Sequence, residues 1–304
     1  MKYFDLHCDT IGECHLQKQP LYRNHLHLDL SRGAEFSAWT QCFAIWIPDE
    51  MRGQQALDYF KAVHQTYVRE CAQNKTLVTP CIENSDFVRA ERLGTCGTVL
   101  TVEGGAVLGG NLDNIPYLAS CGVRMLTLTW NGTCEFGDGA MVTHPKGLTK
   151  FGRKAIPKLE QQRIVVDISH ASYDAAEIAS KPLVASHSNA RAVCNHPRNL
   201  TNEQVQIIKQ SGGLIGLNFH PPFLKEDGIA TVDDLIAHAE HFLSLGAQDS
   251  LAVGSDFDGA DLPQGIRGIE GIYAVFERFL QLGYSETLLN KIFYTNAQKF
   301  FVSL

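Results

Sequence analysis

Six residues able to bind metal ions or transfer protons stand at or near the ends of short apolar runs. They are His7, Asp9, Glu103, His170, His187 and Asp256. Imidazole nitrogens and carboxylate oxygens are the ligands that zinc takes in hydrolytic sites. If the ends of these runs meet in space, the sequence predicts a metal site with a carboxylate beside it for proton transfer.

His7 and Asp9 are two residues apart, so on a strand their side chains point to the same side while Cys8 points away. The H-x-D pattern alone is weak, because this spacing arises by chance in many proteins. A second copy, His27-Leu28-Asp29, follows no apolar run and is flanked by charged residues. We expect that copy in a loop or at the surface.

Glu103 ends the apolar run Thr98–Val102 and precedes Gly104-Gly105. A buried carboxylate has to be paired or coordinated, because an isolated buried charge costs many kcal/mol. A salt bridge to a neighbouring strand is the alternative to metal binding. One carboxylate can also bridge two cations about 3.5–4 Å apart. The two glycines allow another backbone segment to approach closely.

His170 and His187 end two consecutive runs. A lone histidine at a strand end is more often a satisfied core or rim residue, but two of them beside the carboxylates favour metal binding. Asp256 and Asp258 belong to Gly254–Gly259, and the strand register favours Asp256 facing the site. We expect Asp258 to bind a backbone amide in the turn, although both can also be ordinary turn carboxylates.

Strand-like and helix-like segments alternate along the whole chain. Eight apolar, β-branched runs predict strands at Tyr3–His7, Cys42–Ile47, Thr98–Glu103, Val123–Trp130, Arg163–His170, Pro182–His187, Gly213–Phe219 and Leu251–Phe257. This alternation is typical of an α/β (β/α)8 TIM barrel, in which the carboxyl ends of the strands build the active site. We predict one domain over 1–304.

A doubly wound open sheet is the alternative fold. Leu77–Thr79 could add a strand, and the crossover from Glu13 to Ala38 has weak helical character. Helical spacing is clear in Ala56–Val63 and in Val232–Leu243. Ser172 and Thr201 have the residue type and position of helix N-caps.

Charge and cysteine usage limit the class of protein. Lys and Arg total 26 against 33 Asp and Glu, so the net charge of −7 argues against nucleic acid or an anionic membrane as a partner. The 9 cysteines form no C-x-x-C pair, which is typical of free thiols in a reducing compartment. The sequence shows no secretory signal and no apolar run long enough to span a bilayer. We therefore predict a cytoplasmic protein.

Ordered segments along nearly the whole chain resemble the renal (membrane) dipeptidase family of metallopeptidases. The matching segments are FDLHCDT, TVEGG, CGVRMLTLTWN, VVDISHAS, ASHSNARAVCNHPRNLT, GLNF and VGSDFDG. The resemblance implies a barrel with two zinc ions, although other divalent metals would also suit these ligands. By this match, His7 and Asp9 would hold one ion, His170 and His187 the other, and Glu103 would bridge them.

The resemblance also implies roles around the metal site. Asp256 matches the acidic residue that handles protons, and Arg198 matches the arginine that grips the substrate carboxylate; taken alone, Arg198 could equally be a capping or surface residue. The sequence departs from the family where many members have a histidine after L-T-L-T, because Trp130 and then Asn131 stand there. We predict substrate contacts for both, with His144 as a candidate replacement for the histidine.

The predicted function is a metal-dependent dipeptidase in which a hydroxide bridging two zinc ions attacks the peptide carbonyl. One alternative is another metal-dependent amidohydrolase, acting on an N-acyl amino acid, a cyclic amide or a lactone. A second is a non-catalytic metal-binding relative. The expected partner is a small dipeptide. Dimers are common in the family, so a homodimer is implied, although no stretch of the sequence marks an interface.

Overall fold

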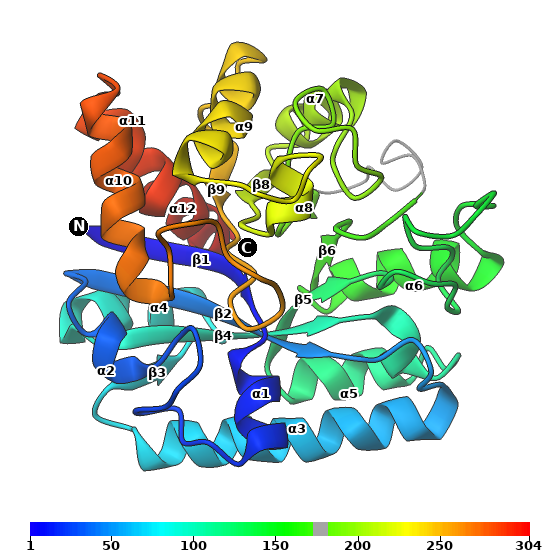
Figure 1. The fold of residues 1–304 in the computed structure, drawn as a ribbon. Coiled ribbons are helices and arrows are strands. Elements are labelled where there is room, and N and C mark those ends of the chain that lie inside the picture. Colours follow the sequence, from blue (N-terminus) through cyan, green and yellow to red (C-terminus); the bar gives the residue numbers. More distant parts are fainter. Residues whose placement is uncertain (173–181) are drawn as a thin grey trace.

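The computed structural model describes residues 1–172 and 182–304. Eight parallel strands form a closed barrel with helices on its outside (Figure 1). Pairing of β2 with β4 closes the ring, since the remaining neighbours run from β2 through β1 and β9 back to β4. The predicted (β/α)8 barrel is therefore confirmed, and the open doubly wound sheet is excluded.

The strands are short, as parallel barrel strands usually are. Their bounds are β1 Lys2–Cys8, β2 Ala38–Trp46, β3 Val78–Pro80, β4 Cys96–Glu103, β5 Val123–Thr127, β6 Val165–Asp167, β7 Val184–Ala185, β8 Leu214–Leu217 and β9 Leu251–Val253. β3 lies outside the ring. It pairs with the first residues of β4, whereas β5 pairs with the last ones, so one edge of β4 serves two partners. The extra strand expected at Leu77–Thr79 thus exists without opening the barrel.

The α-helices fill most of the connections between strands. Their bounds are α1 Thr10–Gln17, α2 Leu30–Gly33, α3 Gly53–Gln73, α4 Asn84–Leu93, α5 Asn114–Ser120, α6 Lys150–Gln161, α7 Asn202–Gln210, α8 Pro221–Leu224, α9 Val232–Ser244, α10 Ile272–Gln281, α11 Glu286–Asn290 and α12 Asn296–Ser303. Shorter 3-10 turns lie at Gly105–Leu108 and Ile269–Gly271, and a π-helical turn at Lys291–Thr295 joins α11 to α12.

The helix predictions are confirmed where the structure describes them. α3 and α9 contain the two segments of helical spacing. The Thr201 hydroxyl accepts a hydrogen bond from the backbone N–H of Gln204, so Thr201 caps α7 as expected. The helix expected after Ser172 lies outside the described residues. The crossover from Glu13 to Ala38 contains only α1 and α2, in keeping with its weak helical signal.

Five predicted strands were too long by two residues or more at their carboxyl ends. The observed ends are Thr127, Asp167, Ala185, Leu217 and Val253. At His170 and Asp256 the backbone has φ of 65° and 63°, in the left-handed region where a strand cannot continue. The residues that we predicted at strand tips therefore lie mostly in the turns that follow the strands.

Apolar side chains fill the barrel and separate it from the helices. One buried cluster lies inside the amino-terminal half of the barrel and continues into α12, where Phe4 stacks on Phe301 with ring centroids 5.4 Å apart. A larger cluster packs the outer faces of the strands against the helices. Within the described residues, no helix combines the length and apolar character that crossing a membrane requires.

Candidate metal centre

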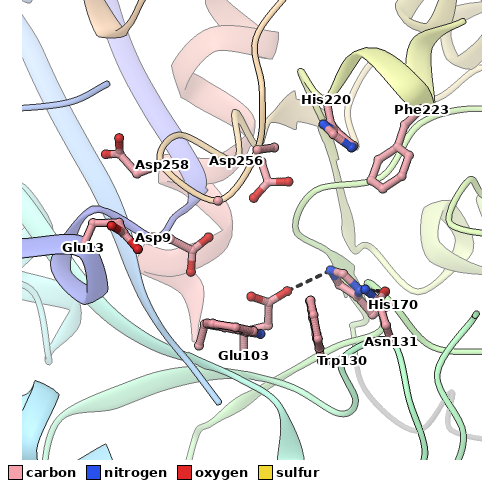
Figure 2. Close-up of a pocket in the computed structure, with 13 residues that line it drawn as sticks. Asp9, Glu13, Glu103, Trp130, Asn131, His170, His220, Phe223, Asp256 and Asp258 are labelled. Carbon is pink, nitrogen blue, oxygen red and sulfur yellow. Dashed lines mark hydrogen bonds and ion pairs between the residues drawn. The ribbon is translucent and has the colours of Figure 1, made fainter. Parts of the chain in front are cut away.

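The five predicted metal ligands lie together at the carboxyl end of the barrel. His7 belongs to β1, Asp9 follows it directly, and Glu103 is the last residue of β4. His170 and His187 lie in the turns after β6 and β7. Figure 2 shows the carboxylates of Asp9 and Glu103 pointing toward one space, with His170 on the far side of Glu103.

The two oxygens of Glu103 face two different sets of donor atoms. Its Oε2 lies 3.7 Å from His7 Nε2. Its Oε1 lies 2.8 Å from His170 Nε2 and 3.4 Å from His187 Nε2. His7 Nε2 is also 3.2 Å from Asp9 Oδ2. Glu103 thus stands between a His7–Asp9 pair and a His170–His187 pair.

Hydrogen bonds determine which ring nitrogen carries the proton in His170 and in His187. The Ser186 hydroxyl donates its proton to Asp167 Oδ2 at 2.5 Å, so at 2.7 Å it accepts from His187 Nδ1. His170 Nδ1 likewise donates to Asn131 Oδ1 at 2.9 Å. Because a neutral imidazole carries one N–H, both Nε2 atoms are left with lone pairs toward the site. This is the arrangement in which histidine binds a metal ion.

The electrostatics of the cluster favour a cation at its centre. Burial lowers the pKa of His170 and of His187 well below the usual value, and the charges of neighbouring Arg198 and His7 act in the same direction. Their Nε2 atoms nevertheless lie only 3.0 Å apart, beside an oxygen of Glu103. Converging lone pairs repel one another unless a positive charge lies between them. The donor set therefore fits a metal ion.

The other side of the cluster also attracts positive charge. Burial by itself would lower the pKa of His7, but the carboxylates of Asp9 and Glu103 raise it to about 10. Asp9 Oδ1 is buried and has no hydrogen-bond partner within the described parts of the chain. Among the residues that the structure describes, two sets have donor atoms within 4.8 Å of one another, namely His7, Glu103 and His187, and His7, Asp9 and Asp256. Asp9 belongs to one of these sets, and a buried carboxylate with an unpartnered oxygen fits a ligand of a divalent ion.

Two buried aspartates hold the turns that carry the site. Asp5 on β1 accepts from the backbone N–H and the hydroxyl of Ser255, at 2.9 and 2.6 Å. Asp167 on β6 accepts from the same two groups of Ser186, at 2.9 and 2.5 Å. Each carboxylate ties a strand to the turn of another strand, and so fixes the position of Asp256 or His187.

Asp256 lines the cavity but does not lie on a strand. Its Oδ2 accepts from Asn218 Nδ2 at 2.9 Å, and its Oδ1 lies 3.8 Å from His7 Nε2. The register argument for choosing Asp256 over Asp258 was wrong, because both residues have positive φ and both line the cavity. Asp258 accepts from the backbone N–H of His27 and from the Thr10 hydroxyl, each at 2.6 Å. Asp258 thus binds a backbone N–H, but that of the distant residue His27 rather than the expected one in its own turn.

Three glycines, Gly104, Gly105 and Gly259, permit the close packing around the ligands. Gly104 has φ of 110°, which favours glycine, and a Cβ on Gly105 would lie 2.5 Å from the carbonyl oxygen of Leu128. A Cβ on Gly259 would lie 2.1 Å from Asp9 Oδ2 and 2.6 Å from Asp256 Oδ1. The carboxylates of Asp9 and Asp256 therefore lie in direct contact with the backbone of Gly259.

The cavity above the cluster has a volume of about 350 Å³. Its lining residues are Asp9, Glu13, Trp46, Glu103, Trp130, Asn131, His170, His220, Phe223, Asp256, Asp258, Gly259 and Ala260. Trp130 packs edge-on against Trp46, with ring centroids 4.9 Å apart. Asn131 contacts His170, so its carbonyl positions that ring. A space of this size and polarity suits a small polar ligand.

Arg198 and His144 lie outside that lining. Arg198 is buried, with Nη2 3.4 Å from the carbonyl oxygen of His187 and its guanidinium 5.3 Å from the ring of Phe223. Its Nε is buried without a partner in the described chain. Burial lowers the pKa of Arg198 to about 10, while Glu103 and Asp256 oppose that shift. His144 is exposed in a loop, so the structure gives no support for its replacing the family histidine.

Besides Gly259 and Ala260, sequence reasoning missed four cavity residues. Trp46 ends β2, and His220 follows β8, so the rule that strand ends face the site could have found both. Glu13 and Phe223 lie on helices, where only the three-dimensional packing reveals that they face the cavity. In the second H-x-D copy, His27 is in a loop as expected, but Asp29 is buried and caps α2.

Comparison with known proteins identifies the family. The family model for membrane dipeptidases (peptidase family M19) matches residues 1–303. The chain belongs to this family. Its members are metallopeptidases that hydrolyse peptide bonds, and the family implies zinc.

Two solved structures have nearly the same fold over almost the full chain. A metallopeptidase from Rhodobacter sphaeroides, crystallised with a phosphinate mimic of the dipeptide L-Ala-D-Ala, has a TM-score of 0.91 at 26% identity, covering 100% of this chain and 99% of that one. A family M19 metallopeptidase, dipeptidase AC, also has a TM-score of 0.91, at 27% identity, covering 99% and 98%.

Sequence relatives differ in how much of their length is matched. An uncharacterized Klebsiella pneumoniae protein from the pqqA 5′ region is 32% identical over 230 residues, covering 71% of this chain and 85% of its own. Human Dipeptidase 3 is 26% identical over 280 residues, covering 88% of this chain. This chain spans only 55% of the length of the human relative.

Proposed function

We propose that this protein is a dipeptidase that holds two zinc ions, with His7 and Asp9 on one, His170 and His187 on the other, and Glu103 between them. The observation that carries the proposal is the position of Glu103. Its Oε2 faces His7, and its Oε1 faces the lone pairs of His170 and His187. A role as a bridge between two metal ions explains this position of the carboxylate better than a salt bridge to a neighbouring strand does.

When bound, a pair of zinc ions supplies a hydroxide nucleophile at neutral pH and polarises the peptide carbonyl. The chain supplies proton transfer. Asn218 holds Asp256 Oδ2 at 2.9 Å, which leaves Oδ1 free on the side of His7. We assign Asp256 Oδ1 to take the proton of the attacking water and deliver it to the leaving amine, which has to be protonated before it departs.

Arg198 is assigned to the free carboxylate of the dipeptide. A guanidinium makes a planar two-pronged contact with a carboxylate that lysine cannot make. The unpartnered Nε of Arg198 supports this role, since a buried donor without a partner costs about 1–3 kcal/mol unless a ligand satisfies it. Trp130 and Phe223 would pack against the substrate on the cavity walls.

Activity measurements on the zinc-loaded protein test the function. The panel contains dipeptides, N-acyl amino acids, cyclic amides and lactones. We expect the protein to hydrolyse the dipeptides. This activity should be lost when a chelator removes the metal and should recover when zinc is restored. Turnover of a lactone or acyl-amino acid in preference to every dipeptide would contradict the dipeptidase assignment. Zinc binding without hydrolysis of any of these compounds would indicate a non-catalytic relative.

Arg198→Ala tests how the substrate is held. We expect kcat/KM for free dipeptides to fall about 10-fold to 100-fold, mainly through KM, because a charge-assisted contact is lost. C-terminally amidated dipeptides lack the free carboxylate that Arg198 would bind, so their kcat/KM should fall far less. An equal loss on both substrates would contradict the assignment.

Location, assembly and domain organisation stay predictions. All 9 cysteines are free thiols, which supports a reducing compartment such as the cytoplasm. We also infer a homodimer, which a measurement of mass in solution would test, and a single domain over the whole chain, which one cooperative unfolding transition would support.

A further inference from the structure

Five carboxylates line the cavity, and four of them already have a task. Glu103 and Asp9 are assigned to metal, and Asp256 to proton transfer. Asp258 is engaged by Thr10 and by the backbone of His27. Glu13 is the carboxylate that these assignments leave over.

Glu13 pairs with no cationic side chain among the described residues. Its only side-chain hydrogen bond is from Gln17 Nε2, at 2.6 Å, and it forms no ion pair with residues in the described ranges 1–172 and 182–304. Glu13 lies in the first turn of α1, where a negative charge interacts favourably with the positive end of the helix dipole. That effect accounts for an acidic residue in this turn, but not for a side chain that lines the cavity.

The position of Glu13 defines how far a ligand group has to extend. Glu13 stands four residues after Asp9, and its backbone N–H donates to the Asp9 carbonyl at 3.1 Å. Residues at this spacing lie on the same helix face with Cβ atoms about 5–6 Å apart. A group that meets Glu13 therefore lies one helical turn farther from the metal cluster than a group that meets Asp9. We therefore expect the α-amino group of a dipeptide, which lies next to the scissile carbonyl, to stop short of Glu13, and a lysine or arginine side chain to be long enough to reach it.

The two ends of the cavity differ in charge. In Figure 2, Glu13 lies on one side with Asp9 and Asp258, and Phe223 and His220 lie on the opposite side. Arg198, assigned to the substrate carboxylate, packs on Phe223. A dipeptide whose carboxylate lies at the Phe223 side places its N-terminal residue toward Glu13. Trp46 ends β2, the neighbour of β1, and supplies an apolar wall for the methylene groups of a long side chain.

We infer that Glu13 selects dipeptides whose N-terminal residue carries a cationic side chain. This inference rests on the proposed function and adds a substrate class to it. A charge-assisted contact in a partly desolvated cavity gives specificity because the neutral analogue leaves the carboxylate without a partner.

The test compares lysyl-alanine with norleucyl-alanine, which has a similarly long side chain without the ammonium group. The readout is the ratio of kcat/KM for the two substrates with zinc-loaded protein. We expect the wild-type ratio to be about 10 or more in favour of lysyl-alanine. In Glu13→Gln, which keeps the contact to Gln17, the ratio should fall close to one, mainly because KM for lysyl-alanine rises. In Glu13→Lys it should fall below one.

Glu277→Gln is the matched control. It removes the same charge from an exposed position on α10, outside the cavity, and should keep the wild-type ratio. A wild-type ratio near one, or an unchanged ratio in Glu13→Gln, would overturn the inference while leaving the dipeptidase assignment in place. If the zinc-loaded wild type hydrolyses neither substrate nor any other dipeptide, the proposed function fails and this inference fails with it.

Discussion

At the amino-terminal end of the barrel the strands carry apolar side chains, and α12 closes this end with Phe300 and Phe301. At the carboxyl end the same strands lead into turns that carry imidazoles and carboxylates. Between the two ends, the buried carboxylates of Asp5 and Asp167 tie strands to turns through Ser255 and Ser186. One set of strands thus serves packing at one end and chemistry at the other.

The two ends contribute to free energy in opposite ways. Burying an aromatic or aliphatic side chain contributes about 1.5–3 kcal/mol to stability. Burying the Glu103 carboxylate beside the neutral rings of His170 and His187 costs free energy, because its charge is desolvated and one of its oxygens faces their lone pairs. The apolar end therefore stabilises the fold, and the polar end is strained until a cation binds. Substitutions at the two ends should separate these contributions.

The largest expected effect on activity is that of Glu103→Gln. Glutamine keeps the size of the side chain but lacks the charge that we propose holds two cations, so hydrolysis should be abolished. The loss should exceed the roughly 10-fold to 100-fold typical of residues that only orient a ligand. Circular dichroism should show an intact fold, and zinc content should fall. Wild-type turnover in this variant would contradict the bridging role and the contrast between the two ends.

Asp256→Asn is expected to have the next largest effect. Asparagine cannot accept and return the proton, so kcat should fall by about 10²-fold to 10⁴-fold while the protein keeps both zinc ions. Loss of one zinc equivalent would instead make Asp256 a metal ligand, consistent with its position beside His7 and Asp9. Unchanged kcat with full zinc content would contradict the proton-transfer role.

Asn131→Ala tests a residue that acts through another. Without the Asn131 carbonyl, His170 loses the contact that fixes its Nδ1 proton, and zinc affinity should fall about 10-fold to 100-fold in competition with a chelator. Asn131→Asp retains an acceptor and should recover most of that affinity. If the two variants bind zinc equally weakly, Asn131 does not act through His170 Nδ1.

Phe301→Ala should have the smallest effect on activity and a large one on stability. Removing this buried ring at the apolar end should lower the free energy of unfolding by about 3–5 kcal/mol, measured with denaturant at a temperature where the variant is folded. The kcat/KM per folded molecule should stay at the wild-type value. Leu93→Ala, at an exposed position, is the control and should leave both quantities almost unchanged. A fall in kcat/KM for Phe301→Ala would mean that the two ends are coupled.

The sequence predicted the barrel because parallel strands buried on both faces are continuous apolar runs, such as those at Thr98–Glu103 and Leu251–Phe257. It predicted which residues gather at one end, because the polar residues follow those runs. It did not predict where the strands stop. His170 and Asp256 adopt left-handed backbone conformations that depend on contacts with other turns.

Contacts between distant loops account for the other differences. The hydrogen bond between Asn131 and His170 joins residues 39 positions apart, so the sequence alone suggested a substrate contact for Asn131. Glu13 belongs to a crossover with weak helical character, and its place in the cavity follows from how α1 packs against β2 and α3. No local pattern in the sequence carries that information.

Anomalous diffraction at the zinc absorption edge, recorded on crystals of the zinc-loaded protein, tests the central claim most directly. We predict two peaks flanking the carboxylate of Glu103, one beside His7 and Asp9 and the other beside His170 and His187. A single peak, or peaks that leave Glu103 uncoordinated, would contradict the binuclear site.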